Sequence, residues 1–110
     1  MTLMHASHES LDYHLHDMNE LKTLEAFTVA ELRLFSRVVA LQSFTAAARE
    51  ARVSQPSVSR LVAHLEERLG GPVVVRTTRR VMPTTLGERL VEALAPVLAR
   101  FSAPAPTRGA

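Results

Sequence analysis

Residues 54–61 read Ser54-Gln55-Pro56-Ser57-Val58-Ser59-Arg60-Leu61 and have the features of a helix start. Ser54 can cap the helix by accepting a hydrogen bond from a first-turn N–H, and Pro56 fits a first turn whose donors are unpaired. At about 100° per residue, the apolar positions form one stripe: Val58, Leu61, Val62, Leu65 and Leu69. The pattern therefore predicts an amphipathic helix with a small, polar leading end.

The leading end of this helix carries no acidic residue. Between Ser54 and Leu65 there is no Asp or Glu, and Glu66 and Glu67 come only in the second half. A helix that enters a DNA major groove by its N-terminus needs short donors and acceptors there, and no negative charge near the phosphates. An ordinary amphipathic surface helix has a similar pattern, so this stretch alone leaves both interpretations open.

The composition limits the class of protein. With 110 residues, of which 46% are hydrophobic, the chain can form one domain with a core. The absence of cysteine excludes disulfide scaffolds, thiolate zinc sites and cysteine nucleophiles. No apolar run reaches the roughly 18 residues that span a bilayer, and the N-terminus lacks the features of a secretory signal. We therefore expect a cytoplasmic protein with no membrane partner.

Charge is distributed unevenly along the chain. Residues 1–30 hold one Lys against five acidic residues, whereas residues 31–110 hold twelve Arg against six Glu. A basic domain behind an acidic leader indicates a polyanionic partner for the domain. Scattered arginines are also common on ordinary surfaces, so this balance supports the hypothesis only weakly.

The two ends of the chain read as tails. Residues 1–27 are polar and aperiodic, and we predict a flexible leader; translation could also begin at Met18. His14 and His16 could in principle hold a metal, but without a third ligand a flexible leader is favoured, and no metal or cofactor is expected. Residues 103–110, rich in Ala and Pro, are predicted to be a flexible tail.

Two helices are predicted before residue 54. Thr28 and Glu31 have the spacing of a capping box, and an apolar stripe follows it: Leu32, Phe35, Val38 and Val39. Thr45 is predicted to cap the second helix, which carries small residues: Ala46, Ala47, Ala48 and Ala51. Arg52 and Val53 form a short connection to the Ser54 helix. Two helices joined by so short a link, the second with a polar tip, are typical of a helix-turn-helix.

A two-stranded wing is predicted after that helix. Gly70-Gly71-Pro72 ends the helix, because Gly supplies a left-handed cap and Pro prevents continuation. Residues 73–76 and 81–83 read as short strands from their β-branched content. Three arginines lie at or beside the tip between them: Arg76, Arg79 and Arg80. A basic tip can meet phosphates or a minor groove, although a solvated hairpin would look similar.

A last helix is predicted over residues 84–102. Thr84 and Thr85 are alternative caps, and Thr85 forms a capping box with Glu88. Its apolar stripe resembles a coiled-coil seam: Leu86, Leu90, Leu94, Val97 and Phe101. Pro96 should kink the helix. The seam could pack on its own domain or against a second copy, and we favour dimerisation.

These motifs together resemble the LysR-type transcriptional regulators, specifically their N-terminal DNA-binding domain with its linker helix. The matching stretches, from about Glu31 to Phe101, keep their order and spacing: Ser43-Phe44-Thr45, Ala47-Ala48, Val53 to Arg60, Leu65-Glu66, Leu69-Gly70, Arg76, Arg79, Thr84 and Gly87. The departures lie mainly in the wing, where the family usually has Leu-Phe instead of Val73-Val74, Gly near the tip instead of Thr78 and Arg80, and Leu instead of Pro83. The leader before Glu31 is also longer than is usual for the family.

The resemblance implies a mainly α fold: a winged helix-turn-helix (residues 28–83) and a dimerising linker helix (residues 84–102). Residues implied to face the major groove are Ser54, Gln55, Pro56, Ser57, Ser59 and Arg60. Those implied to contact DNA backbone or minor groove are Thr45, Arg76, Arg79 and Arg80. Family members continue into an effector-sensing domain, so we expect either a fragment or a truncated regulator without a small-molecule effector site.

We therefore expect a sequence-specific transcription regulator that binds inverted-repeat duplex DNA as a homodimer. The alternative is a helical interaction module that pairs with a longer homologue and does not bind DNA itself. An enzyme is not expected, because Asp occurs only in the leader and His64 is the one histidine of the folded part. The operator, the regulated genes, the direction of regulation and any inducer are not encoded in these motifs.

Overall fold

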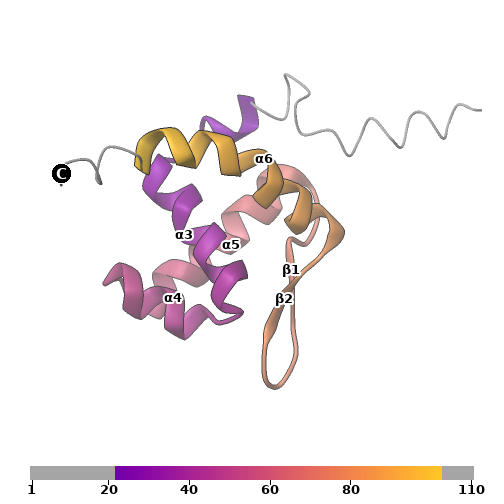
Figure 1. Cartoon of the computed structure of the whole chain (residues 1–110). Helices are drawn as coiled ribbons and strands as arrows, with labels where there is room; N and C mark the ends of the chain where they lie inside the picture. The colour runs from indigo at the N-terminus through magenta and orange to yellow at the C-terminus, as the bar shows by residue number, and fades with distance from the viewer. Residues whose placement is uncertain (1–21, 103–110) are drawn as a thin grey trace, which may run out of the picture.

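The computed structural model describes residues 22–102. A short helical turn at residues 22–24 leads into a helical domain with one two-stranded antiparallel sheet (Figure 1). The elements follow in the order α3 (Val29–Leu41), α4 (Phe44–Ala51), α5 (Gln55–Leu69), β1 (Val74–Arg76), β2 (Val81–Pro83) and α6 (Thr85–Ser102). The predicted fold class, a winged helix-turn-helix followed by a long helix, is confirmed.

Two helix starts show how the caps are chosen. The predicted capping box of α3 is present: Thr28 N donates to Glu31 Oε1 (2.9 Å) and Glu31 N donates to Thr28 Oγ1 (3.0 Å). The predicted cap of α4 is wrong, because Ala46 N donates to Ser43 Oγ (2.9 Å) and Thr45 lies inside the helix. Starting two residues earlier brings Phe44 into the core, where it is 5% exposed. Burial of this ring favours the earlier start.

The ends of α3 and α4 depend on residues with positive φ. Gln42 (φ 56°) and Arg52 (φ 63°) take the left-handed conformation that usually favours glycine. Their backbone N–H groups reach back to the preceding turn, Gln42 N to Val38 O and Arg52 N to the carbonyl oxygens of Ala48 and Arg49. The chain therefore turns sharply at both points, which keeps the links to α4 and α5 short.

The core lies between α3, α4, α5 and α6, and the base of the wing closes it. Its largest fully buried side chains are Phe35, Val38, Val58, Leu65, Val73 and Leu90. Leu24 and Phe27 are also buried, each 7% exposed. The prediction that the leader extends to residue 27 is therefore wrong at its end, because these two side chains pack into the core. Residues 1–21 and 103–110 lie outside the described part of the chain, so the rest of the predicted leader and the predicted tail are not assessed.

The wing has a buried base and an exposed tip. Val75 pairs with Met82 across the two strands. Val73, just before β1, and Val81, which pairs with Arg76 at the other end of the sheet, are both buried. Val81 N donates to Gln42 O (3.1 Å), which ties the wing to the end of α3. At the tip, Thr77 N donates to Arg80 O (2.8 Å) and closes a four-residue turn.

The wing and α6 meet at Thr84. The Thr84 hydroxyl donates to Pro72 O (2.7 Å) and accepts from Gly87 N (3.0 Å), so Thr84 caps α6 and the alternative cap at Thr85 is not used. Gly87 is buried against β1, and a Cβ at this position would lie 2.0 Å from Val73 O. The Thr-x-x-Gly spacing therefore has a steric cause: the first turn of α6 passes against the backbone at the start of the wing.

The predicted seam of α6 is divided by the fold. Leu90, Leu94 and Leu98 are buried within the chain's own core, whereas Val97 is 41% exposed and Phe101 is 59% exposed. α6 packs mainly on α3 and continues through Pro96 to Ser102 (Figure 1). Leu98 was absent from the predicted stripe because 3-residue and 4-residue steps fit a helix equally well.

No helix within residues 22–102 has the length and apolar character that crossing a membrane requires.

Candidate nucleic-acid interface

The N-terminal end of α5 presents a polar surface on a buried base. Val58, Leu61, Val62 and Leu65 hold the helix to the core. The predicted recognition residues lie elsewhere on the helix: Gln55, Pro56 and Arg60 are exposed, and Ser57 and Ser59 are half-buried. The apolar stripe predicted from the sequence thus separates the residues that hold the helix from those that remain available to a ligand.

Hydrogen bonds along α5 organise its first turns. Ser57 N donates to Ser54 Oγ (3.1 Å), which confirms Ser54 as the cap, and the two serine hydroxyls share a further bond (2.8 Å). Arg60 Nη2 donates to Ser57 Oγ (3.4 Å). This contact occupies one of the five N–H donors of the guanidinium. The Arg60 side chain is exposed, so its remaining donors are accessible to a ligand.

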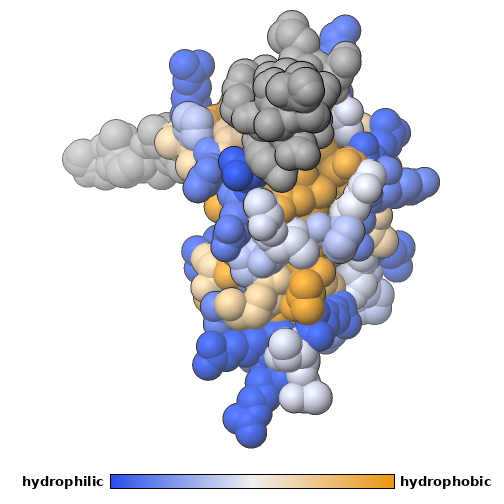
Figure 2. All heavy atoms as spheres, turned by 90° about the vertical axis from the view of Figure 1, so that its right-hand side faces the viewer, coloured by the Kyte–Doolittle hydropathy of each residue, from blue (hydrophilic) through white to orange (hydrophobic). Residues whose placement is uncertain are grey.

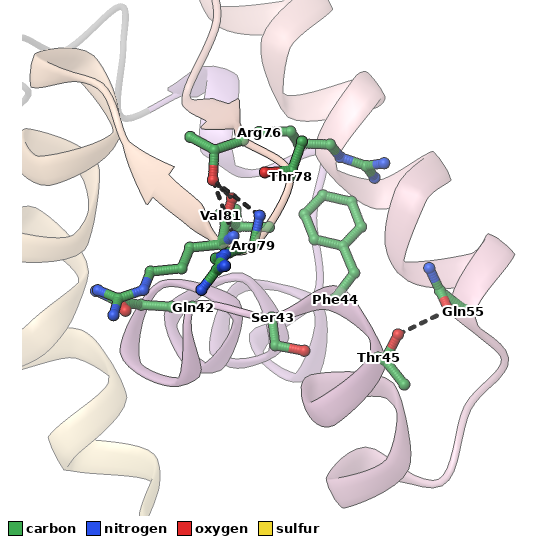
Figure 3. A pocket seen from close by; sticks show the side chains of 11 residues that line it. Gln42, Ser43, Phe44, Thr45, Gln55, Arg76, Thr78, Arg79 and Val81 are labelled. Atoms are coloured by element: carbon green, nitrogen blue, oxygen red, sulfur yellow. Dashed lines mark hydrogen bonds between the residues drawn. The ribbon is translucent and has the colours of Figure 1, made fainter.

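Thr45 and Gln55 connect the two helices of the helix-turn-helix. Thr45 lies in the first turn of α4 and Gln55 is the first residue of α5. The Thr45 hydroxyl donates to Gln55 Oε1 at 2.9 Å, and both side chains are exposed (Figure 3). The structure therefore brings together a residue predicted to contact DNA backbone and one predicted to contact bases.

Arg76 joins the wing to both helices. Its guanidinium carbon lies 3.9 Å from the centroid of the Phe44 ring, a cation–π contact, and its Nη2 donates to Ser59 Oγ (3.5 Å). The sequence placed Arg76 only at or beside the wing tip. Its contact with Phe44, which belongs to α4, was missed because no local pattern links residues so far apart in the chain.

An open groove of about 300 Å³ lies between the wing and the N-terminal ends of α4 and α5 (Figure 3). Thr45, Gln55, Arg76, Arg79 and Arg80 all line it, and none of its lining residues is acidic. The N-terminal ends of two helices add partial positive charge. Gln42 and Ser43 also line the groove. Sequence reasoning missed both, although Ser43 could have been found as an alternative helix cap.

Arg79 and Arg80 occupy the wing tip. Their backbone N–H groups donate to Thr77 Oγ1, at 3.2 and 2.9 Å, and their side chains are exposed. Figure 2 shows a hydrophilic lower end of the face on which the wing lies, with hydrophobic residues gathered above it. Val75 and Met82, partners across the wing, are among the exposed hydrophobic residues. The turn thus fixes the backbone from which both arginines project.

Not every predicted site residue lies in the groove. Arg60 and Ser57 line a separate hollow with Glu31 and His64. His64 is exposed, and its ring lies 4.8 Å from that of Phe27, centroid to centroid. Within residues 22–102 no three His, Cys, Asp or Glu residues are grouped to hold a metal. His14 and His16 lie outside the described residues.

One ion pair connects the helices on the outside of the domain. Arg37 Nε and Nη2 donate to the two carboxylate oxygens of Glu50, at 2.7 and 3.0 Å. The hydrogen bond from Arg37 lowers the pKa of Glu50 below its ordinary value, and the same bond raises the pKa of Arg37. Both side chains are exposed, so this pair links α3 to α4 and does not build the groove.

The helix-turn-helix, the basic wing and the groove between them define the winged helix-turn-helix class of DNA-binding domain. The family model described as "Bacterial regulatory helix-turn-helix protein, lysR family" matches residues 29–88. This chain therefore belongs to the lysR family and contains its helix-turn-helix DNA-binding domain.

Individual relatives agree with this assignment. The HTH-type transcriptional regulator PgrR of Escherichia coli (strain K12) is 43% identical over 70 residues, which are 64% of this chain and 23% of PgrR. Among solved structures, the BenM_DBD/catB site 1 DNA complex has a TM-score of 0.65 at 31% identity, covering 76% of this chain and 93% of that one. Oxidized OxyR of Corynebacterium glutamicum has a TM-score of 0.64 at 34% identity, covering 69% of this chain and 25% of that one. PgrR is by name a transcriptional regulator, which agrees with the expectation that this chain is not an enzyme.

Proposed function

We propose that this domain binds duplex DNA sequence-specifically and thereby regulates transcription, in the cytoplasm. The observation that carries the proposal is the groove between the wing and the helix-turn-helix, which is lined by three arginines and by no acidic residue. The similarity to the BenM DNA-binding domain, solved in a complex with DNA, supports it. In this proposal the N-terminal end of α5 enters the major groove.

The proposal gives separate roles to the two sets of residues. Side chains at the tip of α5 read base edges, because only base contacts carry sequence information. The set comprises Ser54, Gln55, Pro56, Ser57, Ser59 and Arg60. Thr45 and the wing arginines contact backbone or minor groove and supply affinity that falls with salt. Arg76 acts from the junction of wing and helices, and Arg79 and Arg80 act from the tip.

We further propose that two copies associate through the outer surface of α6. Val97 and Phe101 are exposed there, whereas Leu90 and Leu94 are already used in the chain's own core. A homodimer in which each copy presents one α5 helix would bind an inverted repeat, because the symmetry of the protein matches that of the site. Of the residues that the sequence predicts for dimerisation, the exposed ones, Val97 and Phe101, form this proposed contact surface.

The decisive experiment is selection of bound duplexes from a random pool, followed by binding of the selected duplex at several salt concentrations. We expect an inverted-repeat sequence and an affinity that falls linearly with salt on a log–log plot. A single half-site would contradict the dimer but not DNA binding. Failure to select any sequence, together with no salt-dependent binding of duplex DNA, would instead support the alternative of an interaction module that does not bind DNA.

A further inference from the structure

We propose that Thr45 sets the base preference of position 55 by fixing the orientation of the Gln55 amide. In this orientation the amide displays N–H donors, so it selects a base edge that offers acceptors, guanine or thymine, over adenine. This inference rests on the proposed DNA binding and adds a specificity-determining role for a residue outside the recognition helix.

The first support is that both side chains project from rigid backbone. Ser43 caps α4 and Phe44 is buried, so the first turn that carries Thr45 is fixed on the core. Ser54 caps α5 and Pro56 follows Gln55, which fixes the backbone of position 55. The 2.9 Å bond from Thr45 Oγ1 to Gln55 Oε1 therefore restricts the side-chain torsions of an otherwise exposed glutamine.

The second support is electrostatic. The amide oxygen of Gln55 lies beside the first turn of α4, where unpaired N–H groups give the helix end a partial positive charge. An amide rotated by 180° could still bond to Thr45 by donating to its hydroxyl, but it would place a positively polarised NH2 group beside the positive helix end. The charge of the helix end therefore favours the orientation in which the oxygen faces Thr45.

The consequence concerns the amide nitrogen. Gln55 Nε2 points away from Thr45 (Figure 3), and among the described residues it has no hydrogen-bond partner. It offers two donors. Guanine presents two acceptors in the major groove and thymine presents one, whereas the usual pairing of glutamine with adenine needs the amide oxygen and nitrogen together. Because the oxygen is turned toward Thr45 (Figure 3), the displayed N–H groups favour a base edge that offers acceptors, and adenine is the less favourable partner.

The test compares base preferences of variants by selection from a pool of randomised duplexes. Gln55→Ala first identifies the DNA position read by Gln55, as the position whose preference disappears. At that position the wild type should prefer guanine or thymine. Thr45→Val removes the hydroxyl without changing the shape of the side chain and should reduce discrimination there by about tenfold, the size of one good base contact. Thr45→Ser keeps the hydroxyl and should retain the preference.

A second variant tests the same inference without altering Thr45. Gln55→Glu can still accept from Thr45 but replaces the displayed donors by an acceptor, so the preference should move to cytosine, whose N4 is a donor. A wild-type preference for adenine would overturn the inference, as would a Thr45→Val variant that loses affinity equally on all sequences, since Thr45 would then only contact backbone. Wild-type protein that binds no duplex would overturn the proposed function itself, before any variant is compared.

Discussion

Helices α5 and α6 each bury one stripe of apolar residues, but they leave different side chains outside. α5 leaves polar groups and Arg60 exposed, whereas α6 leaves Val97 and Phe101 exposed. Burial therefore accounts for the position of both helices, and their exposed residues indicate different partners. The surface of α5 suits a hydrated polyanion, and the surface of α6 suits another apolar surface.

The largest effect is expected where α6 serves the core. Leu90→Ala removes a fully buried side chain and should lower the free energy of unfolding by about 2–5 kcal/mol. The matched control is Val97→Ala on the same helix, where substitution of an exposed side chain should change it by roughly 0.5 kcal/mol or less. Urea denaturation at low protein concentration measures both. Equal losses of unfolding free energy in the two variants would show that Leu90 does not belong to the core and Val97 to the surface.

Gly87 tests the contact between α6 and the wing. Gly87→Ala adds a Cβ that meets Val73 O at 2.0 Å, so the backbone must shift, at a cost of about 1–3 kcal/mol or more. The control is Gly71→Ala, whose Cβ would lie 3.6 Å from Leu86 Cδ2, an ordinary contact. Thermal denaturation of the two variants compares them. A wild-type stability for Gly87→Ala would contradict the close packing described here.

Arg60 tests the exposed face of α5. Arg60→Ala should weaken binding to the selected duplex by about 1–3 kcal/mol and leave the free energy of unfolding nearly unchanged. Arg68→Ala, which removes the same charge from the far end of the same helix, is the control and should have a much smaller effect. Titration of a labelled duplex measures both. Unchanged affinity for Arg60→Ala would mean that this face of α5 does not contact DNA.

Arg79 distinguishes the wing tip from α5. Arg79→Ala should weaken binding on specific and unrelated duplexes alike and reduce the slope of log affinity against log salt by about one unit. The measurement is a salt series on two duplexes of different sequence. A loss confined to the selected duplex would assign Arg79 to base reading and remove the proposed division between tip and helix.

The smallest effect is expected away from both helices, at the Arg37–Glu50 pair. The pKa of Glu50 is lowered in the folded state by the hydrogen bond from Arg37. The pair therefore adds stability above the unfolded-state pKa, which is lost as the pH falls through the folded-state pKa. Glu50→Gln should be slightly less stable than wild type at neutral pH and equal to it in acid. A difference that persists in acid would show that the lost carboxylate charge is not its cause.

Much of the fold could be predicted from local patterns, and the errors have physical causes. The capping box of α3, the cap of α5 and both strands of the wing follow rules that act within a few residues. Ser43 and Thr45 both satisfy the rules for a cap, and only the burial of Phe44 selects between them. Leu24 and Phe27 lack a helical period, so their burial depends on distant partners.

The candidate site was less predictable than the fold. Residue types in the helix-turn-helix and wing indicated the basic surface, because charge and helical phase are read directly from the sequence. The contacts that arrange this surface join distant segments: Arg76 with Phe44, and Thr45 with Gln55. The predicted seam of α6 included Val97 and omitted Leu98, whereas the structure buries Leu98 and exposes Val97. The direction in which α6 crosses α3 decides which of the two is covered, and the local sequence does not contain it.

The Thr84 hydroxyl couples the base of the wing to the first turn of α6. It bonds to Pro72 just before β1 and to Gly87 in the first turn of α6, while Gly87 lies directly against Val73. A rotation of α6 must therefore carry the base of the wing with it. In the proposed dimer, a change in the angle between two α6 helices would move both wings relative to the DNA axis. The junction at Thr84 would then transmit a change in dimer geometry to the contact between the wings and the DNA.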